Sequence, residues 1–67
     1  MVIIETEAFG KPREVEPQEY SDEALLRLLY AYEASGYSFH EETIPTHRFV
    51  GERWAEGSIV SRVTIFV

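Results

Sequence analysis

A chain of 67 residues that contains no cysteine has to build a stable fold without disulfides. Domains of this size bury only about 60% of the surface that the unfolded chain exposes, so many depend on a metal, a disulfide or a partner subunit. The lack of cysteine excludes a disulfide framework and a cysteine-based zinc site. A well-packed core or a partner, which includes a second copy of the chain, must then supply the stability.

The chain has enough apolar material for one small core. Four Phe, four Tyr and one Trp accompany many Ile, Val and Leu residues, and aromatic side chains bury about 150–250 Å² each. We therefore expect one globular domain over residues 1–67. The N-terminus has no basic region typical of a signal peptide, and no run approaches the roughly 20 apolar residues that span a bilayer. We expect a soluble, cytoplasmic protein without membrane partners.

Residues 22–34 have the pattern of an amphipathic helix. Ser21 is a suitable N-cap, and Asp22 and Glu23 place negative charge where the helix dipole favours it. Gly36 is placed to end the helix in a left-handed conformation. Apolar residues at i, i+3, i+4 and i+7 predict the buried side of this helix, which consists of Leu25, Leu28, Leu29 and Tyr32.

The remaining segments have the alternation typical of strands. We expect a strand over residues 2–9, a short returning strand over 13–16, and an edge strand or extended loop over 37–45. Residues 46–54 and 59–67 predict a hairpin, whose last run is β-branched and suits a central strand. The predicted fold is α+β: a small antiparallel sheet of three to four strands in β-α-β-β order, with the C-terminal strand central and the helix on one face.

The register of the hairpin decides which side chains share a face. If Trp54 pairs with Ile59, the core side carries the pairs Trp54/Ile59, Val50/Val63, Arg48/Ile65 and Thr46/Val67. One helix covers only one face of a sheet, so the second face is the predicted contact surface. Aromatic and arginine side chains are typical of interface centres. The predicted partner-binding residues are Phe49, Arg53, Val60, Arg62 and Phe66.

Three arrangements of that surface are compatible with the sequence. It packs under residues 37–45, it joins two copies face to face as a homodimer, or it binds a different protein. Direct binding of single-stranded nucleic acid, with bases stacked on Phe49 and Phe66, is disfavoured because the chain carries a net charge of −6.

Acidic residues concentrate in the first third of the chain. Residues 1–24 contain seven acids and two bases, a net −5, whereas residues 46–67 contain two acids and three bases, a net +1. The seven acids are either a solvated face or a mimic of nucleic-acid phosphates that binds a basic protein. This acidic face consists of Glu5, Glu7, Glu14, Glu16, Glu19, Asp22 and Glu23.

Few residues suggest catalysis or metal binding. His40, Glu41, Glu42 and His47 are of the types that bind zinc, but their spacing matches no recognised signature. The four glycines are scattered and form no phosphate-binding loop, and Ser21 is explained as a helix cap. We predict no catalytic residues, no metal and no cofactor.

These observations rank three hypotheses. The first is a non-enzymatic protein-binding domain, a small inhibitor or regulator that acts through an exposed sheet face and self-associates. The second is an acidic nucleic-acid mimic that inhibits a DNA- or RNA-binding protein. The third is a small metal-binding protein or enzyme that uses His40 and His47. No family signature is apparent in these residues.

Overall fold

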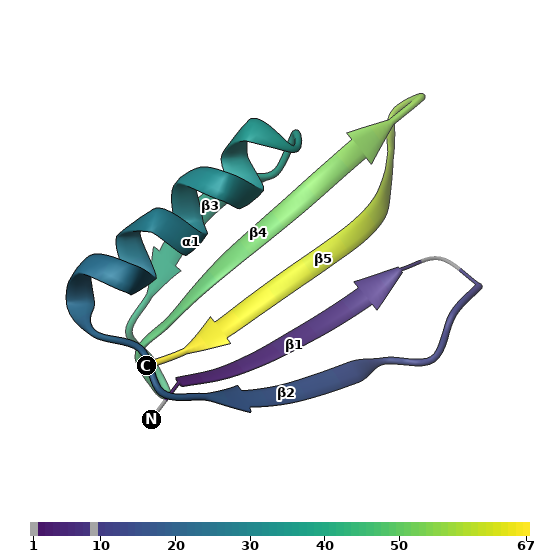
Figure 1. The fold of residues 1–67 in the computed structure, drawn as a ribbon. Coiled ribbons are helices and arrows are strands. Elements are labelled where there is room, and N and C mark those ends of the chain that lie inside the picture. The colour runs from purple at the N-terminus through teal and green to yellow at the C-terminus, as the bar shows by residue number, and fades with distance from the viewer. Residues whose placement is uncertain (1, 9) are drawn as a thin grey trace.

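The computed structural model of the protein describes residues 2–8 and 10–67. Within these residues, five strands form one antiparallel sheet that is accompanied by one helix (Figure 1). The elements follow the chain as β1 (Val2–Ala8), β2 (Glu14–Gln18), α1 (Asp22–Ala34), β3 (Ser38–Glu42), β4 (Arg48–Ala55) and β5 (Ser58–Phe66). The strand order across the sheet is β2-β1-β5-β4-β3.

The structure confirms the α+β class, the helix on one face and the central position of the C-terminal strand. The predicted number of strands, three to four, was too low. Residues 14–18 form an edge strand in place of the shorter segment 13–16, and residues 38–42 form the opposite edge. Pro17 lies on one edge, where a residue without an N–H is tolerated. The strand expected over 2–9 spans Val2–Ala8, and Phe9 lies outside the described residues.

Helix α1 begins and ends where the sequence predicts. The Ser21 side chain accepts a hydrogen bond from the Ala24 backbone N–H at 3.2 Å, which satisfies one of the free donors of the first turn. Gly36 adopts a φ of +99°, and the Tyr37 N–H donates to the Tyr32 carbonyl at 3.1 Å. A glycine in the left-handed conformation after the last turn allows this bond, which satisfies a carbonyl at the C-terminus of the helix.

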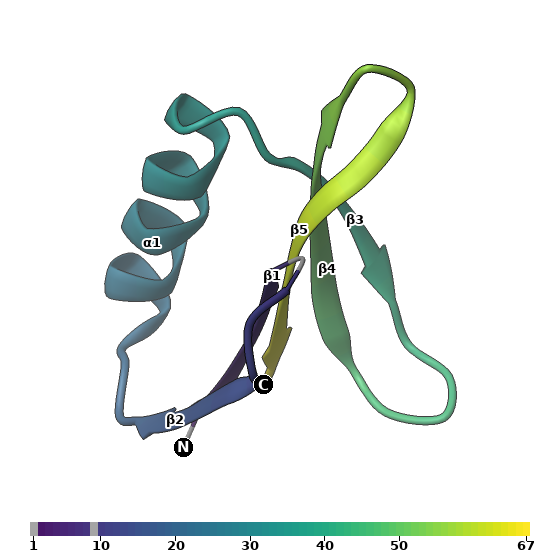
Figure 2. The ribbon, with the colours of Figure 1, turned by 90° about the vertical axis from the view of Figure 1, so that its right-hand side faces the viewer.

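The core lies between α1 and the middle of the sheet. Val2 and Ile4 of β1 and Val63 and Ile65 of β5 are its buried members. The predicted helix stripe packs against them, joined by four aromatic side chains from neighbouring elements: Tyr20, Tyr37, Phe39 and Phe49. Figure 2 shows the helix on one side of the sheet.

The β4–β5 hairpin has a tight turn and one irregularity. Glu56 and Gly57, the two turn residues, both have positive φ, as in a type I′ turn, and Trp54 pairs with Ile59 as predicted. Beyond that pair the register shifts by one residue, so that Arg53 pairs with Ser61 and Val60 has no partner in the ladder. Val60 is therefore the extra residue of a β-bulge.

Because of the bulge, the side chains on the two faces of the hairpin differ from those predicted. Gly51 pairs with Val63 and Phe49 with Ile65, so Phe49 joins the core, while Val50 and Arg48 point to the opposite side. Trp54, predicted to face the core, is 58% exposed. A slip of one residue exchanges the two faces of a strand, and this is what the bulge does here.

Within the described residues, no helix has the length and apolar character needed to cross a bilayer.

Candidate functional site

The sheet face turned away from α1 is covered by no other element of the described chain (Figure 2). We call it the open face. The strand register aligns its side chains in three rows that each cross the sheet from β2 or β1 to β3. The first row is Pro17, Ile3, Phe66, Arg48 and Glu42. The second is Val15, Glu5, Thr64, Val50 and His40, and the third is Glu7, Arg62, Glu52 and Ser38.

One corner of the open face is apolar. Ile3 and Val15 are 38% and 54% exposed, and both lie beside Pro17 on the β1–β2 hairpin. Phe66 of β5 is the cross-strand neighbour of Ile3 and continues the apolar surface toward the centre of the sheet. Four exposed or half-buried apolar side chains from three strands therefore lie next to one another.

The charged side chains of the open face largely neutralise one another. Arg13 lies 3.8 Å from Glu5, Arg62 lies 3.0 Å from Glu52, and Arg48 forms an ion pair with Glu42. With Glu7, the face has four acids and three bases, a net −1. The rest of the chain then has eight acids and three bases, a net −5. The open face is thus the nearly neutral side of a strongly acidic protein.

The β3 end of this network includes a histidine. His40 Nε2 lies 2.6 Å from a carboxylate oxygen of Glu42, whose other oxygen accepts from Arg48. The hydrogen bond with His40, and then the charge of Arg48, hold the pKa of the Glu42 carboxyl below its usual value of 4.5. Glu42 is therefore a stable anion at neutral pH.

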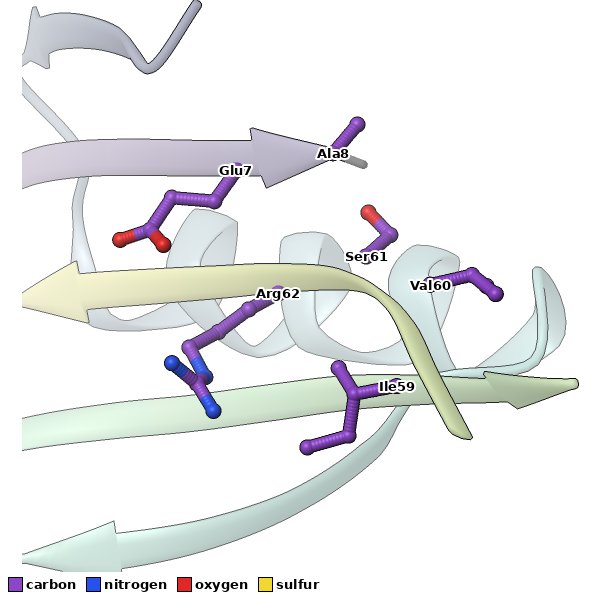
Figure 3. Close-up of a pocket in the computed structure, with 6 residues that line it drawn as sticks. All are labelled: Glu7, Ala8, Ile59, Val60, Ser61 and Arg62. Carbon is purple, nitrogen blue, oxygen red and sulfur yellow. The ribbon is translucent and has the colours of Figure 1, made fainter. Parts of the chain in front are cut away.

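The middle of the open face is hollowed. A depression of about 380 Å³ lies between the rows, lined by the apolar Val50 and Phe66 and by charged residues that include Arg48, Glu52 and Arg62. A smaller depression of about 190 Å³ lies at the end of β1, beside the bulge. Figure 3 shows its lining, in which Glu7 and Arg62 extend in the same direction over the sheet. Both depressions are open and mixed in polarity, which suits contact with a protein surface better than enclosure of a small apolar ligand.

The five predicted partner-binding residues do not form one surface. Arg62 and Phe66 lie on the open face, and Val60 lies at its margin in the bulge. Phe49 packs against the core on the helix side, and Arg53, which pairs with Ser61, lies on that side too. The prediction of one shared face was wrong for Phe49 and Arg53, because an unbulged hairpin was assumed.

The seven residues of the predicted acidic face are also divided. Glu5 and Glu7 belong to the open face, and Glu5 is in an ion pair with Arg13. Glu14 and Glu16 lie on the helix side of β2, since Glu16 is the neighbour of the buried Ile4. Of the other three, Asp22 and Glu23 lie in the first turn of α1, and Glu19 lies just before its N-cap. A continuous stripe, as phosphate mimicry along a duplex requires, is not formed by these seven.

The histidines belong to two separate pairs. His40 pairs with Glu42 on the open face, whereas His47 Nε2 lies 2.5 Å from a carboxylate oxygen of Glu41, whose strand neighbour Phe49 faces the helix side. Among the residues that the structure describes, no group of three or more His, Cys, Asp or Glu side chains is placed to hold a metal ion.

The apolar corner was not predicted from the sequence, because it forms only when β2 pairs with β1 and brings Val15 and Pro17 beside Ile3. The alternation of residues 2–8 did put Ile3 on the same side as Glu5 and Glu7, so part of the signal was present. Val15 and Pro17 carried little signal, since a five-residue strand with two glutamates resembles a loop.

Comparisons with known proteins do not add to this description: no family model, curated protein or solved structure matches the chain.

Proposed function

We propose that this chain is a non-enzymatic protein-binding domain, a small regulator that self-associates through its open sheet face. The observation that carries the proposal is the contrast in charge between that face and the rest of the molecule. Two copies with net charge −6 repel each other, so a contact surface is favoured where charges are already compensated. The open face has a net −1, and the remainder has −5.

The chemistry of the open face supports a protein as the occupant. Interfaces enrich aromatic and arginine side chains and set polar groups around an apolar centre. Here Ile3, Val15 and Phe66 supply apolar area, and Arg48 and Arg62 supply cations that are already oriented by carboxylates. A nucleic acid meets no excess of positive charge on this surface, which disfavours it.

Self-association is favoured over a different partner by the alternation of charge. The third row runs Glu7, Arg62, Glu52, so acid and base follow each other across β1, β5 and β4. In a two-fold arrangement the same row meets itself in the opposite direction. When the two copies are offset by one strand, Arg62 of each copy lies opposite Glu52 of the other, so both contacts join opposite charges. The short chain also gains from a partner the burial that its own core lacks.

Light scattering across a concentration series tests this proposal. We expect the mass to approach twice the chain mass of 7.8 kDa at high concentration, in both low and high salt. Val15→Lys and Ile3→Lys place an unpaired cation in the apolar corner, so each is expected to shift dissociation to at least about tenfold higher concentration. Both positions are exposed, so the monomer should keep its fold, which circular dichroism checks.

Leu26→Lys is the matched control. Leu26 is 52% exposed and lies on α1, away from the open face, so the same substitution there should leave dimerisation unchanged. A wild-type protein that stays monomeric at all concentrations would contradict self-association. Equal loss of the dimer in Leu26→Lys and Val15→Lys would assign the contact to another surface.

A further inference from the structure

Two of the six cationic side chains differ from the other four in their ion pairing. Arg13, Arg27, Arg48 and Arg62 each form an ion pair with a glutamate. Lys11 and Arg53 form none with any residue that the structure describes, although the chain contains twice as many acids as bases. Both of them line the same depression, which has a volume of about 280 Å³ and lies on the helix side of the sheet. We call it the Lys11–Arg53 hollow.

Neighbouring groups hold Arg53 in position. Its guanidinium carbon lies 5.8 Å from the centre of the Tyr37 ring, a cation–π arrangement. The aliphatic part of its side chain passes Gly36, where an added Cβ would lie 3.5 Å from Arg53 Cδ. An arginine placed over a ring keeps the N–H donors at the edge of its guanidinium plane available for a bidentate contact with an oxyanion.

The hollow also contains hydroxyl groups held in a fixed position. Ser61, 4% exposed, faces the helix side, and its Oγ lies 2.6 Å from the Tyr37 hydroxyl. Thr6 of β1 lines the same space. The Lys11 backbone N–H donates to the Ala8 carbonyl at 3.1 Å and closes the turn that brings this lysine to the hollow. Glu14 is the acid of the lining, which leaves the hollow with a net charge of +1.

A hollow with a net positive charge, in which neither cation forms an ion pair with a described carboxylate, is unusual for a protein of net charge −6, because nearby acids normally pair with such groups. We propose that the Lys11–Arg53 hollow binds a small oxyanion, the phosphate or carboxylate group of a small ligand, through the Arg53 guanidinium and the Lys11 ammonium. The volume is close to the roughly 300 Å³ at which small-molecule sites begin, so the ligand has few atoms beyond the anionic group. The hollow lies on the opposite side from the open face, and the inference does not depend on self-association.

NMR titration tests the site with two probes, inorganic phosphate and acetate, each at constant ionic strength balanced with sodium chloride. We expect saturable shifts of the Arg53 Nε–H signal and of the Ser61 and Tyr37 amides, with a dissociation constant on the order of millimolar. Arg53→Gln and Lys11→Gln should each weaken binding about tenfold or more, since each removes a charged donor. Lys11 is exposed in a turn, so its variant keeps the test valid if Arg53→Gln does not fold.

Arg27→Gln is the control, because Arg27 is a paired cation on the exposed side of α1 and its loss should leave the titration unchanged. Saturation by phosphate but not acetate assigns a phosphoryl ligand, and the reverse assigns a carboxylate. The inference is overturned if neither probe saturates, or if Arg53→Gln and Lys11→Gln bind as well as the wild type.

Discussion

At the residue scale, Gly51 is needed where strand β4 passes beneath an aromatic ring. Gly51 is buried on the helix side of β4 and pairs with Phe39 of β3. A Cβ built at this position would lie 2.5 Å from two carbons of the Phe39 ring, which is closer than van der Waals contact permits. The ring therefore occupies the space that a side chain at residue 51 would need, and it covers the glycine backbone as a cross-strand partner.

We expect Gly51→Ala to lower the free energy of unfolding by about 1–3 kcal/mol, because the new methyl group displaces a packed ring. Urea denaturation measures the change. Phe39→Leu provides the control. The double variant should lose less free energy of unfolding than the sum of the two single losses, since the smaller leucine side chain leaves room for the new methyl group. Strictly additive losses would show that the ring and the methyl group do not compete.

The stability of the fold at acidic pH depends on the ionisation of Glu42. Its pKa is lowered in the folded protein by the His40 hydrogen bond and then by Arg48, so its stabilising contribution is complete above the usual value of 4.5 and is lost as pH falls through the lower folded value. Glu42→Gln should therefore destabilise the protein at pH 6 and have a smaller effect at pH 3. Urea denaturation at both values measures this difference. Equal losses of stability at pH 6 and at pH 3 would contradict this role of Glu42.

At the element scale, the β4–β5 hairpin combines a strained turn with a bulge. Glu56 has a φ of +53°, in the left-handed region where most side chains are unfavourable. The Tyr37–Ser61 hydrogen bond requires Ser61 to face the helix side. The extra residue Val60 turns Ser61 to that side while Trp54 remains paired with Ile59. The turn and the bulge together decide which side chains reach the open face.

Glu56→Asn should raise the free energy of unfolding by about 0.5–1 kcal/mol, because asparagine tolerates the left-handed conformation and Asn-Gly is the preferred type I′ turn. Thermal and urea denaturation measure the gain. Glu56→Val, which is β-branched and poorly suited to positive φ, should have the opposite effect. A gain in both variants would mean that removal of the negative charge, and not the backbone conformation, is responsible.

At the scale of the whole molecule, the core is small and one sheet face lacks a cover. In the described chain, five apolar residues are buried: Val2, Ile4, Val50, Val63 and Ile65. A protein with so little buried surface gains stability from any partner that binds the folded state alone. If the open face joins two copies, the apparent stability of the fold therefore increases with protein concentration.

We expect the wild-type melting temperature to rise with protein concentration, by several degrees over a hundredfold range, since association favours the folded chain by mass action. Differential scanning calorimetry measures the dependence. Val15→Lys should have a melting temperature that is nearly independent of concentration, and Leu26→Lys should behave as the wild type does. A wild-type melting temperature that does not change with concentration would count against a folded dimer.

Local chemistry made α1 and the hairpin turn predictable from the sequence. The Ser21 cap, the stripe from Leu25 to Tyr32 and the stop at Gly36 act within a few residues of one another, so the sequence specifies them whatever surrounds the helix. The same holds for Glu56-Gly57, because a two-residue turn depends on its own backbone angles. The long β-branched run at the C-terminus likewise identified the central strand.

The open face and the Lys11–Arg53 hollow depend on long-range contacts that no local pattern specifies. The open face exists as described because Val60 bulges out of the ladder, and the contact between Ser61 and Tyr37, 24 residues apart, matches that bulge. The apolar corner required β2 to pair with β1, and the Lys11–Arg53 hollow joins a turn near the N-terminus to a strand near the C-terminus. Alternation in the sequence identified the two sets of side chains on each strand. Because a shift of one residue exchanges the two faces, only tertiary packing determined which set faces the helix.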